Sequence, residues 1–284
     1  MKLLLKRIKI FILSQENILL RLSLFRMIFA GLLIFVIVTE DSKFRYLFYF
    51  DNYYFKTSAW YAPYFDYWKG FNLFLVAVYF TGYFHQLTKI LVAVSMLPYL
   101  YYLDHHLVQV TEPIWFYSAY LPTFIIAQLF CKTDAYSWRL KPLSQTPQDS
   151  EMSPKPSDAF FLFFFQIYVI NMFFQSAISK IFISSFAWFI DGRFIRIHTL
   201  ISGTPLGIYI TGHPLVFKAI GWMTFLFEFF GVIIYWLRPS FYGIAAIIFH
   251  LSTWIIMDIN FIFMWPIYLP IFFKWKKLKE YISV

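Results

Sequence analysis

A polar stripe runs along one predicted helix of an otherwise apolar chain. Residues 166–192 begin like a membrane-spanning helix, but Asn171, Gln175 and Ser179 follow one another at intervals of four and therefore share one face. Uncompensated polar groups are costly in hydrocarbon, so we expect this face to line a protein interior or a wet cavity. Lys180 ends the stripe and is the one candidate base in the stretch.

Lys180 has three possible roles. As an unprotonated amine it would act as a general base on a bound ligand. It would otherwise extend to the outer lipid headgroups, or pair with Asp191 or a lipid phosphate. The residues beneath it favour a site, because a lysine that only reaches the headgroups does not need Asn171 and Gln175.

Two further ionisable residues lie inside predicted spans. Glu228 stands in the segment WMTFLFEFFGVII, and His250 stands in AAIIFHLSTWII. Ionisable groups inside spans are costly and are usually paired or functional. Either Glu228 and His250 hydrogen-bond to each other and lock two helices together, or they contact a substrate or take part in catalysis.

The adjacent pair His105-His106 raises the question of a metal site. Adjacent histidines cannot both face one ion from a regular helix, and no HxxxH or HExxH spacing occurs. Ordinary polarity of an outer loop is the favoured interpretation, with His106 kept as a candidate ligand contact, and no metal is expected. The single cysteine, Cys131, excludes an intrachain disulfide and a cysteine zinc site.

The composition is that of a polytopic membrane protein. Of the 284 residues, 60% are hydrophobic and 14% are charged, whereas soluble domains average roughly 45–50% and about 25%. We therefore predict an all-α transmembrane helix bundle that forms a single domain over residues 1–284, with about eight spans of about 20 residues each. The predicted spans are 18–39, 71–84, 90–102, 115–131, 159–183, 214–236, 241–257 and a short one at 260–273.

The basic residues indicate orientation rather than nucleic-acid binding. The net charge is +9, but lysines and arginines crowd the two ends of the chain, as the positive-inside rule produces. Both termini are therefore predicted to be cytoplasmic, with residues 1–16 forming a basic amphipathic helix on the membrane surface and residues 132–157 a cytoplasmic loop. The outer side then receives residues 40–69, a structured tyrosine-rich loop, and residues 184–213, an interfacial helix followed by a turn. The polar site should open outward.

Several motifs along the chain are similar to those of a known family. The chain resembles the membrane domain shared by vitamin K-dependent gamma-carboxylases and the horizontally transferred transmembrane (HTTM) proteins of bacteria. The resemblance extends over about residues 22–273. It rests on the order and spacing of Ser176-Ala177-Ile178-Ser179-Lys180-Ile181, Trp188, Asp191-Gly192, the stretch 133–137, Glu228, Phe249-His250 and the stretch 260–263.

The resemblance implies a reaction. In the carboxylases the lysine that matches Lys180 deprotonates reduced vitamin K, and O2 then converts the quinol to a strongly basic alkoxide. This alkoxide removes a glutamyl γ-proton and leaves as the epoxide, and CO2 adds to the carbanion. Carried over, Lys180 and His250 would be catalytic. The candidate substrate contacts are Gln175, Asn171, Trp188, Asp191, Glu228, Tyr117 and His106.

Two departures from the carboxylases limit what is carried over. The carboxylases have a large extramembrane C-terminal portion, and they carry a histidine where this chain has Tyr117. We therefore expect a multi-pass protein of the bacterial cytoplasmic membrane that binds a reduced quinone, with a carboxylase-like lyase and epoxidase reaction as the enzymatic hypothesis. The alternative is a non-enzymatic membrane factor for the maturation or export of, or immunity to, a secreted peptide.

Overall fold

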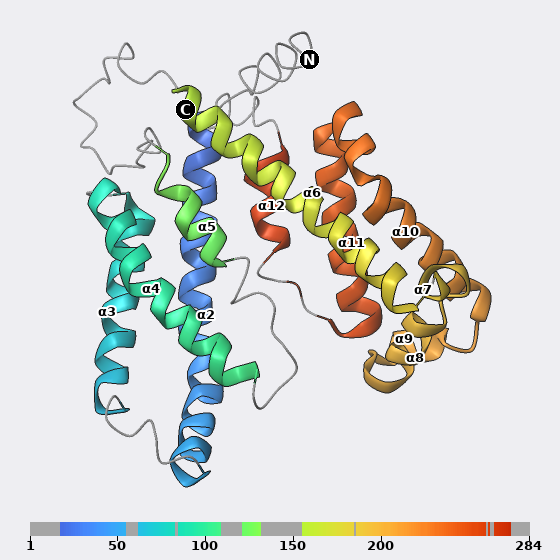
Figure 1. Ribbon diagram of the computed structural model, residues 1–284, viewed down its shortest axis with the longest axis horizontal. Coiled ribbons are helices and arrows are strands. Elements are labelled where there is room, and N and C mark those ends of the chain that lie inside the picture. Colours follow the sequence, from blue (N-terminus) through green and yellow to red (C-terminus); the bar gives the residue numbers. More distant parts are fainter. Residues whose placement is uncertain are drawn as a thin grey trace, which may run out of the picture. The chain divides into compact units, whose positions relative to one another are not determined.

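A computed structural model describes residues 18–54, 62–82, 85–108, 121–131, 155–184, 186–259, 261 and 264–273, and every regular element in these ranges is a helix (Figure 1). The chain divides into two compact units, Met1–Phe161 and Leu162–Val284, and each is described by itself. The single domain predicted from the sequence stays a prediction. The predicted surface helix over residues 1–16 and nearly all of the predicted loop over 132–157 lie outside the described residues.

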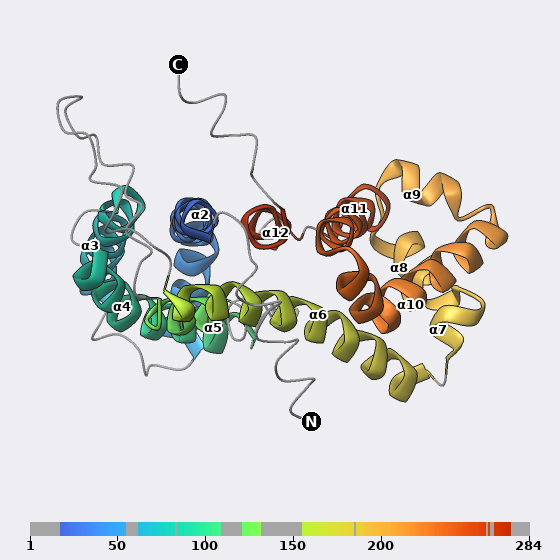
Figure 2. The same cartoon turned by 90° about the horizontal axis from the view of Figure 1, so that it is seen from above.

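The first unit is built from α2 (Ile18–Tyr54), α3 (Ala62–Thr81), α4 (His85–Val108) and α5 (Leu121–Gln128). Figures 1 and 2 show α2, α3 and α4 side by side, with α5 against α4. Phe25 and Phe29 of α2 pack edge-to-face on Phe124 of α5, with ring centroids 5.7 and 5.8 Å apart. Such aromatic contacts fill the interior where these helices meet.

Helical structure extends further here than the sequence patterns predicted. Residues 40–69 were expected to form an outer loop, but α2 continues to Tyr54 and α3 already begins at Ala62. Residues 40–54 contain no proline or glycine, so nothing in them ends the helix. The break predicted between the spans 71–84 and 90–102 was also misplaced. α3 ends at Thr81, Gly82 follows with a left-handed φ of 78°, and α4 starts at His85.

The second unit holds α6 (Pro156–Ser184) from Leu162 onward, together with α10 (Pro214–Leu237), α11 (Pro239–Met257) and α12 (Trp265–Phe272). Proline stands at the start of both α10 and α11, where its missing N–H costs nothing. Arg238 alone separates these two helices. α6 begins at Pro156, three residues before the predicted start of its span and inside the predicted loop.

Between α6 and α10 the chain forms three short helices: α7 (Ala187–Ile190), α8 (Arg193–Ser202) and α9 (Pro205–Ile210). The sequence predicted one interfacial helix and a turn in this region, but the structure has three helices there. Gly192, with φ 64°, separates α7 from α8, and Thr204 caps α9 by accepting a hydrogen bond from the Gly207 N–H. The three helices gather at one end of the α10–α11 pair (Figure 1).

Four of the described helices are long and apolar enough to cross a membrane: Ile18–Thr39, Pro156–Phe182, Pro214–Leu237 and Pro239–Met257. A shorter apolar helix covers Gln86–Leu100, and α5 and α12 have eight residues each. The part of the chain that the structure describes is all-helical, and its four long apolar helices indicate a membrane protein. Eight spans and cytoplasmic termini stay predictions.

Candidate functional site

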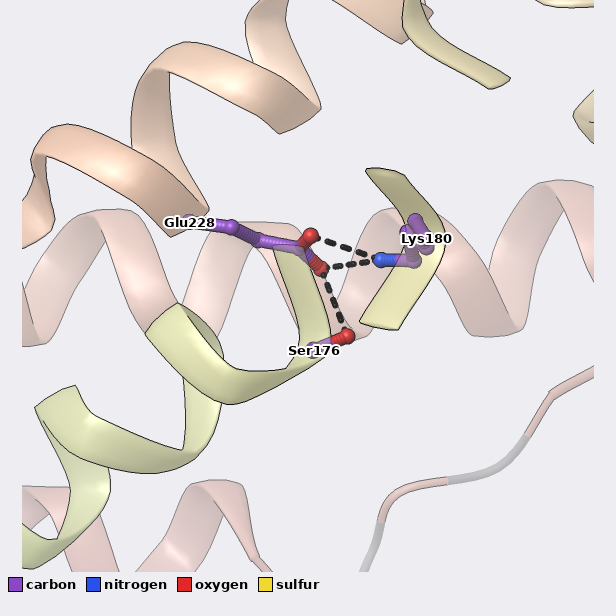
Figure 3. A network of polar contacts seen from close by, with 3 residues as sticks. All are labelled: Ser176, Lys180 and Glu228. Carbon is purple, nitrogen blue, oxygen red and sulfur yellow. Dashed lines mark hydrogen bonds and ion pairs between the residues drawn. The ribbon is translucent and has the colours of Figure 1, made fainter. Parts of the chain in front are cut away.

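Lys180 and Glu228 form an ion pair between α6 and α10. The Lys180 Nζ donates to both carboxylate oxygens of Glu228, at 2.5 Å to Oε1 and 2.7 Å to Oε2, and the Ser176 Oγ donates to Oε1 at 3.3 Å (Figure 3). The Glu228 side chain is 2% exposed, whereas that of Lys180 is 20% exposed. A buried carboxylate is thus compensated by an ammonium that keeps partial access to its surroundings.

The helices explain why these three side chains meet. Ser176 and Lys180 are four residues apart on α6, so both project from the same face. Glu228 lies in the middle of α10 and is buried. A carboxylate without partners in such a place would be costly, and the pair with Lys180 offsets that cost.

The structure shows which polar partners these residues have, and their predicted roles in catalysis or substrate contact stay predictions. Glu228 binds Lys180 and Ser176 and does not hydrogen-bond to His250. Asp191 pairs with Arg193, at 3.4 Å between Oδ2 and Nη2, and accepts the Arg193 backbone N–H at 2.8 Å. The predicted pairing of Lys180 with Asp191 is therefore replaced by the pairing with Glu228.

The polar stripe of α6 lies beside the ion pair rather than on its face. Asn171, Gln175 and Ser179 are exposed, although the sequence predicted that they line an interior. Gln175 directly precedes Ser176, and Ser179 directly precedes Lys180. A step of one residue turns the side chain by about 100° around a helix, so Gln175 and Ser179 lie beside the face that meets Glu228. The ligand contacts predicted for Asn171 and Gln175 stay predictions.

Trp188 borders the site on its partly exposed side. The Lys180 Nζ lies 5.7 Å from the centroid of the indole ring, within the range of a cation–π interaction. The indole also stacks on Phe194 of α8, with ring centroids 5.5 Å apart and an interplanar angle of 11°. Phe186, with φ 70°, precedes α7 in a left-handed conformation that is unusual for a bulky residue, and it turns the chain toward Trp188.

His250 belongs to a separate polar contact in the same unit. Its Nε2 is 2.9 Å from the Tyr268 hydroxyl of α12, and its Nδ1 is buried without a hydrogen-bond partner. The ring of Phe173 packs on His250 at 5.3 Å and on Phe227 at 4.9 Å. An aromatic layer therefore adjoins His250, and no direct contact joins it to the Lys180–Glu228 pair.

The sequence did not identify Tyr235 and Tyr268 as buried hydrogen-bond partners in this unit. Gln166 donates from Nε2 to the Ile271 carbonyl at 2.8 Å and accepts from the Tyr235 hydroxyl at 2.7 Å. The tyrosines Tyr235 and Tyr268 gave no signal, because tyrosine is common throughout this chain and also serves as an interfacial residue. The only sequence signal for Ser176 was its spacing of four residues from Lys180.

The remaining predicted site residues have no described side chain. Tyr117 lies outside the described residues, and of His106 only the backbone, within α4, is described. Among the residues whose positions the structure defines, no group of three or more histidine, cysteine, aspartate or glutamate side chains is placed to hold a metal ion.

Comparisons with family models, with curated proteins and with solved structures find no match to this chain. The fold and the site define a helical membrane protein with a compensated ion pair inside its helices. The resemblance to HTTM proteins and gamma-carboxylases stays a proposal.

Proposed function

We propose that this chain is an HTTM-like integral membrane protein whose Lys180–Glu228 pair accepts a proton from a lipophilic, hydroxylated ligand of the reduced-quinone class. The observation that supports this most directly is the asymmetry of the pair. Glu228 is enclosed, whereas Lys180 is partly exposed beside an indole. A ligand hydroxyl can therefore approach the nitrogen, and the carboxylate stays behind it.

Proton transfer within the pair would supply the base. When the ammonium proton moves from Lys180 to the Glu228 carboxylate, the pair becomes a neutral amine beside a neutral carboxylic acid, two forms that an apolar interior tolerates. The amine then takes the proton of the ligand hydroxyl. The O–H bond breaks, an N–H bond forms, and the resulting ammonium lies next to the new oxyanion and stabilises it.

The resemblance to gamma-carboxylases names the ligand and its co-reactants. They would be vitamin K hydroquinone or a related reduced quinone, O2, CO2 and a glutamyl side chain. Trp188 and Asp191, on the segment that borders Lys180, would contact the ligand, and His250 would help to shape its surroundings. The proposal includes eight spans, cytoplasmic termini and the bacterial cytoplasmic membrane, which the basic ends of the chain support.

The test is to identify what the purified protein carries. Native mass spectrometry and lipid extraction of the full chain should reveal a bound quinone. A Lys180→Met variant should lose it, whereas Lys218→Met, an exposed lysine on the same unit, should retain it. A preparation that carries no quinone after supplementation with reduced quinone, or equal retention by both variants, would refute the proposal.

One observation favours the alternative of a non-enzymatic membrane factor for a secreted peptide. Both Glu228 oxygens already have partners in Lys180, and one of them also in Ser176, so the three residues join α6 to α10 without any ligand. A structural pair would tolerate joint replacement. If Lys180→Met/Glu228→Gln supports maturation, export or immunity as the wild type does, the alternative holds.

A further inference from the structure

Helix α8 carries an apolar stripe that is exposed in the part of the chain that the structure describes. Phe194, Ile197 and Ile201 are 39%, 47% and 78% exposed, and their spacing of three and four residues places them on one face. The opposite face is buried, with Ile195 at 3% and Thr199 at 0% exposure. The helix is thus apolar on two sides, one against its own unit and one outward.

The segment that carries α8 packs beside the first turns of α10, at one end of the α10–α11 pair. A Cβ atom at Gly221 would lie 2.5 Å from the Phe189 carbonyl oxygen, so α7 contacts α10 closely at that point. Gly221 is seven residues from Pro214, about 10 Å into the helix at 1.5 Å per residue. α8 therefore lies at the level of the first turns of α10, where Leu215 and Val216 are exposed as well.

Basic side chains gather around the start of α10. The Arg196 Nε donates to the Thr211 carbonyl at 2.8 Å, three residues before Pro214, and Arg196 is an exposed residue. Arg193, whose side chain is 72% exposed, follows Gly192, which lies directly against the backbone of Phe217. Lys218 is exposed on the second turn of α10.

The positive charge and the apolar stripe together indicate what binds to this surface. Over the described residues 187–218, Arg193, Arg196 and Lys218 outnumber the one acidic residue, Asp191. An amphipathic helix with apolar residues outward and arginines at the level where a span begins has the chemistry of a bilayer interface with anionic headgroups. A water-facing surface would not expose Phe194, Ile197 and Ile201 in one line.

We propose that α8 is an interfacial helix that places Phe194, Ile197 and Ile201 in the acyl-chain region and binds anionic phospholipid headgroups through Arg193, Arg196 and Lys218. Phe194 connects this surface to the Lys180 site, since its ring stacks on Trp188 and Trp188 faces the Lys180 Nζ. The inference does not depend on the quinone proposal, because it rests only on α8 and the first turns of α10.

Spin labels would measure the depth of α8 in vesicles of phosphatidylcholine and phosphatidylglycerol. Cys131 is buried, so labelling of the folded full chain is confined to an introduced cysteine. Labels at Ile197→Cys and Ile201→Cys should be more accessible to O2 than to a water-soluble nickel complex. A label at Gly212→Cys should show the reverse, because a Cβ there meets only the Tyr209 carbonyl at 3.6 Å in an exposed turn. Equal nickel accessibility at positions 197 and 212 would overturn the placement.

Lipid retention would test the headgroup contacts. After purification from vesicles that contain equal amounts of the two lipids, the Arg193→Gln/Arg196→Gln variant should show a lower ratio of retained phosphatidylglycerol to phosphatidylcholine than the wild type. Each arginine removed should lower this ratio about fivefold. Arg238→Gln, a single Arg→Gln substitution at the other end of α10, should lower this ratio by less than the roughly fivefold expected for each arginine near α8. Arg196→Lys should keep the retention, which separates the charge from the Nε bond to Thr211. Equal losses in the double variant and in Arg238→Gln would refute specific binding at α8.

Discussion

Removing either partner of the Lys180–Glu228 pair should destabilise the protein, but by different amounts. Lys180→Met leaves the Glu228 carboxylate buried, with only the Ser176 hydrogen bond at 3.3 Å. Loss of one partner from a buried pair costs about 3–5 kcal/mol. Glu228→Gln leaves a lysine that is 20% exposed on a flexible stem, which can turn outward, and we expect a cost of about 1–2 kcal/mol.

The double variant provides the quantitative check. Lys180→Met/Glu228→Gln removes the uncompensated charge, so its stability should lie close to that of Glu228→Gln alone. The coupling free energy from the double-mutant cycle should then equal the cost of Lys180→Met, about 3–5 kcal/mol in magnitude, at or above the upper end for residues in contact. Lys218→Met, an exposed lysine with no ion pair in the described part of the chain, should change stability by less than about 0.5 kcal/mol.

Unfolding in mixed micelles with increasing sodium dodecyl sulfate, followed by the fluorescence of the 10 tryptophans, would measure these differences. Each variant should first show wild-type helicity by circular dichroism. Equal costs for Lys180→Met and Glu228→Gln would mean that Glu228 is not enclosed as described. Additive costs in the double variant would mean that the two side chains do not interact.

Two further predictions concern packing in the second unit. Tyr268→Phe should cost about 1–3 kcal/mol, because it removes the 2.9 Å hydrogen bond to His250 and leaves both imidazole nitrogens unpaired in a buried position; an unchanged thermal midpoint would contradict this. Gly221→Ala should cost about 1–3 kcal/mol, because the new Cβ would lie 2.5 Å from the Phe189 carbonyl oxygen. Its control is Gly31→Ala on α2, where nothing lies within 4 Å and the better helix propensity of alanine should be neutral or stabilising by up to about 1 kcal/mol. Equal effects of the two alanines on the midpoint would argue against the close approach of α7 to α10.

The long apolar helices follow from local properties of the chain. The predicted spans 159–183, 214–236 and 241–257 correspond to α6, α10 and α11 within three residues at each end. Their ends are marked by prolines, by a polar residue such as Arg238 and by the length that hydrocarbon requires. All of these signals can be read within about 25 residues of sequence.

The connecting segments were predicted less well, because composition there does not define backbone conformation. Residues 40–54 are polar and tyrosine-rich, yet they continue α2, since no residue in them interrupts the hydrogen bonds of the helix. Residues 184–213 form three helices, whose breaks depend on left-handed Gly192 and on the close packing of Gly203 against the Thr199 and Ile256 carbonyls. Such contacts are tertiary and leave only glycines in the sequence.

The ionisable residues of the site were identifiable from the sequence alone, and their pairing was not. Lys180, Glu228 and His250 stand out because charge is costly in apolar helices. Which of them meet depends on how α6 rotates against α10 across 48 positions of sequence. A rotation by one residue would have brought Gln175 and Ser179 to the interior; the packing brings Ser176 and Lys180 to Glu228 and leaves His250 with Tyr268. The local apolar pattern determined that a compensated site must exist, and the packing of the helices decided which side chains form it.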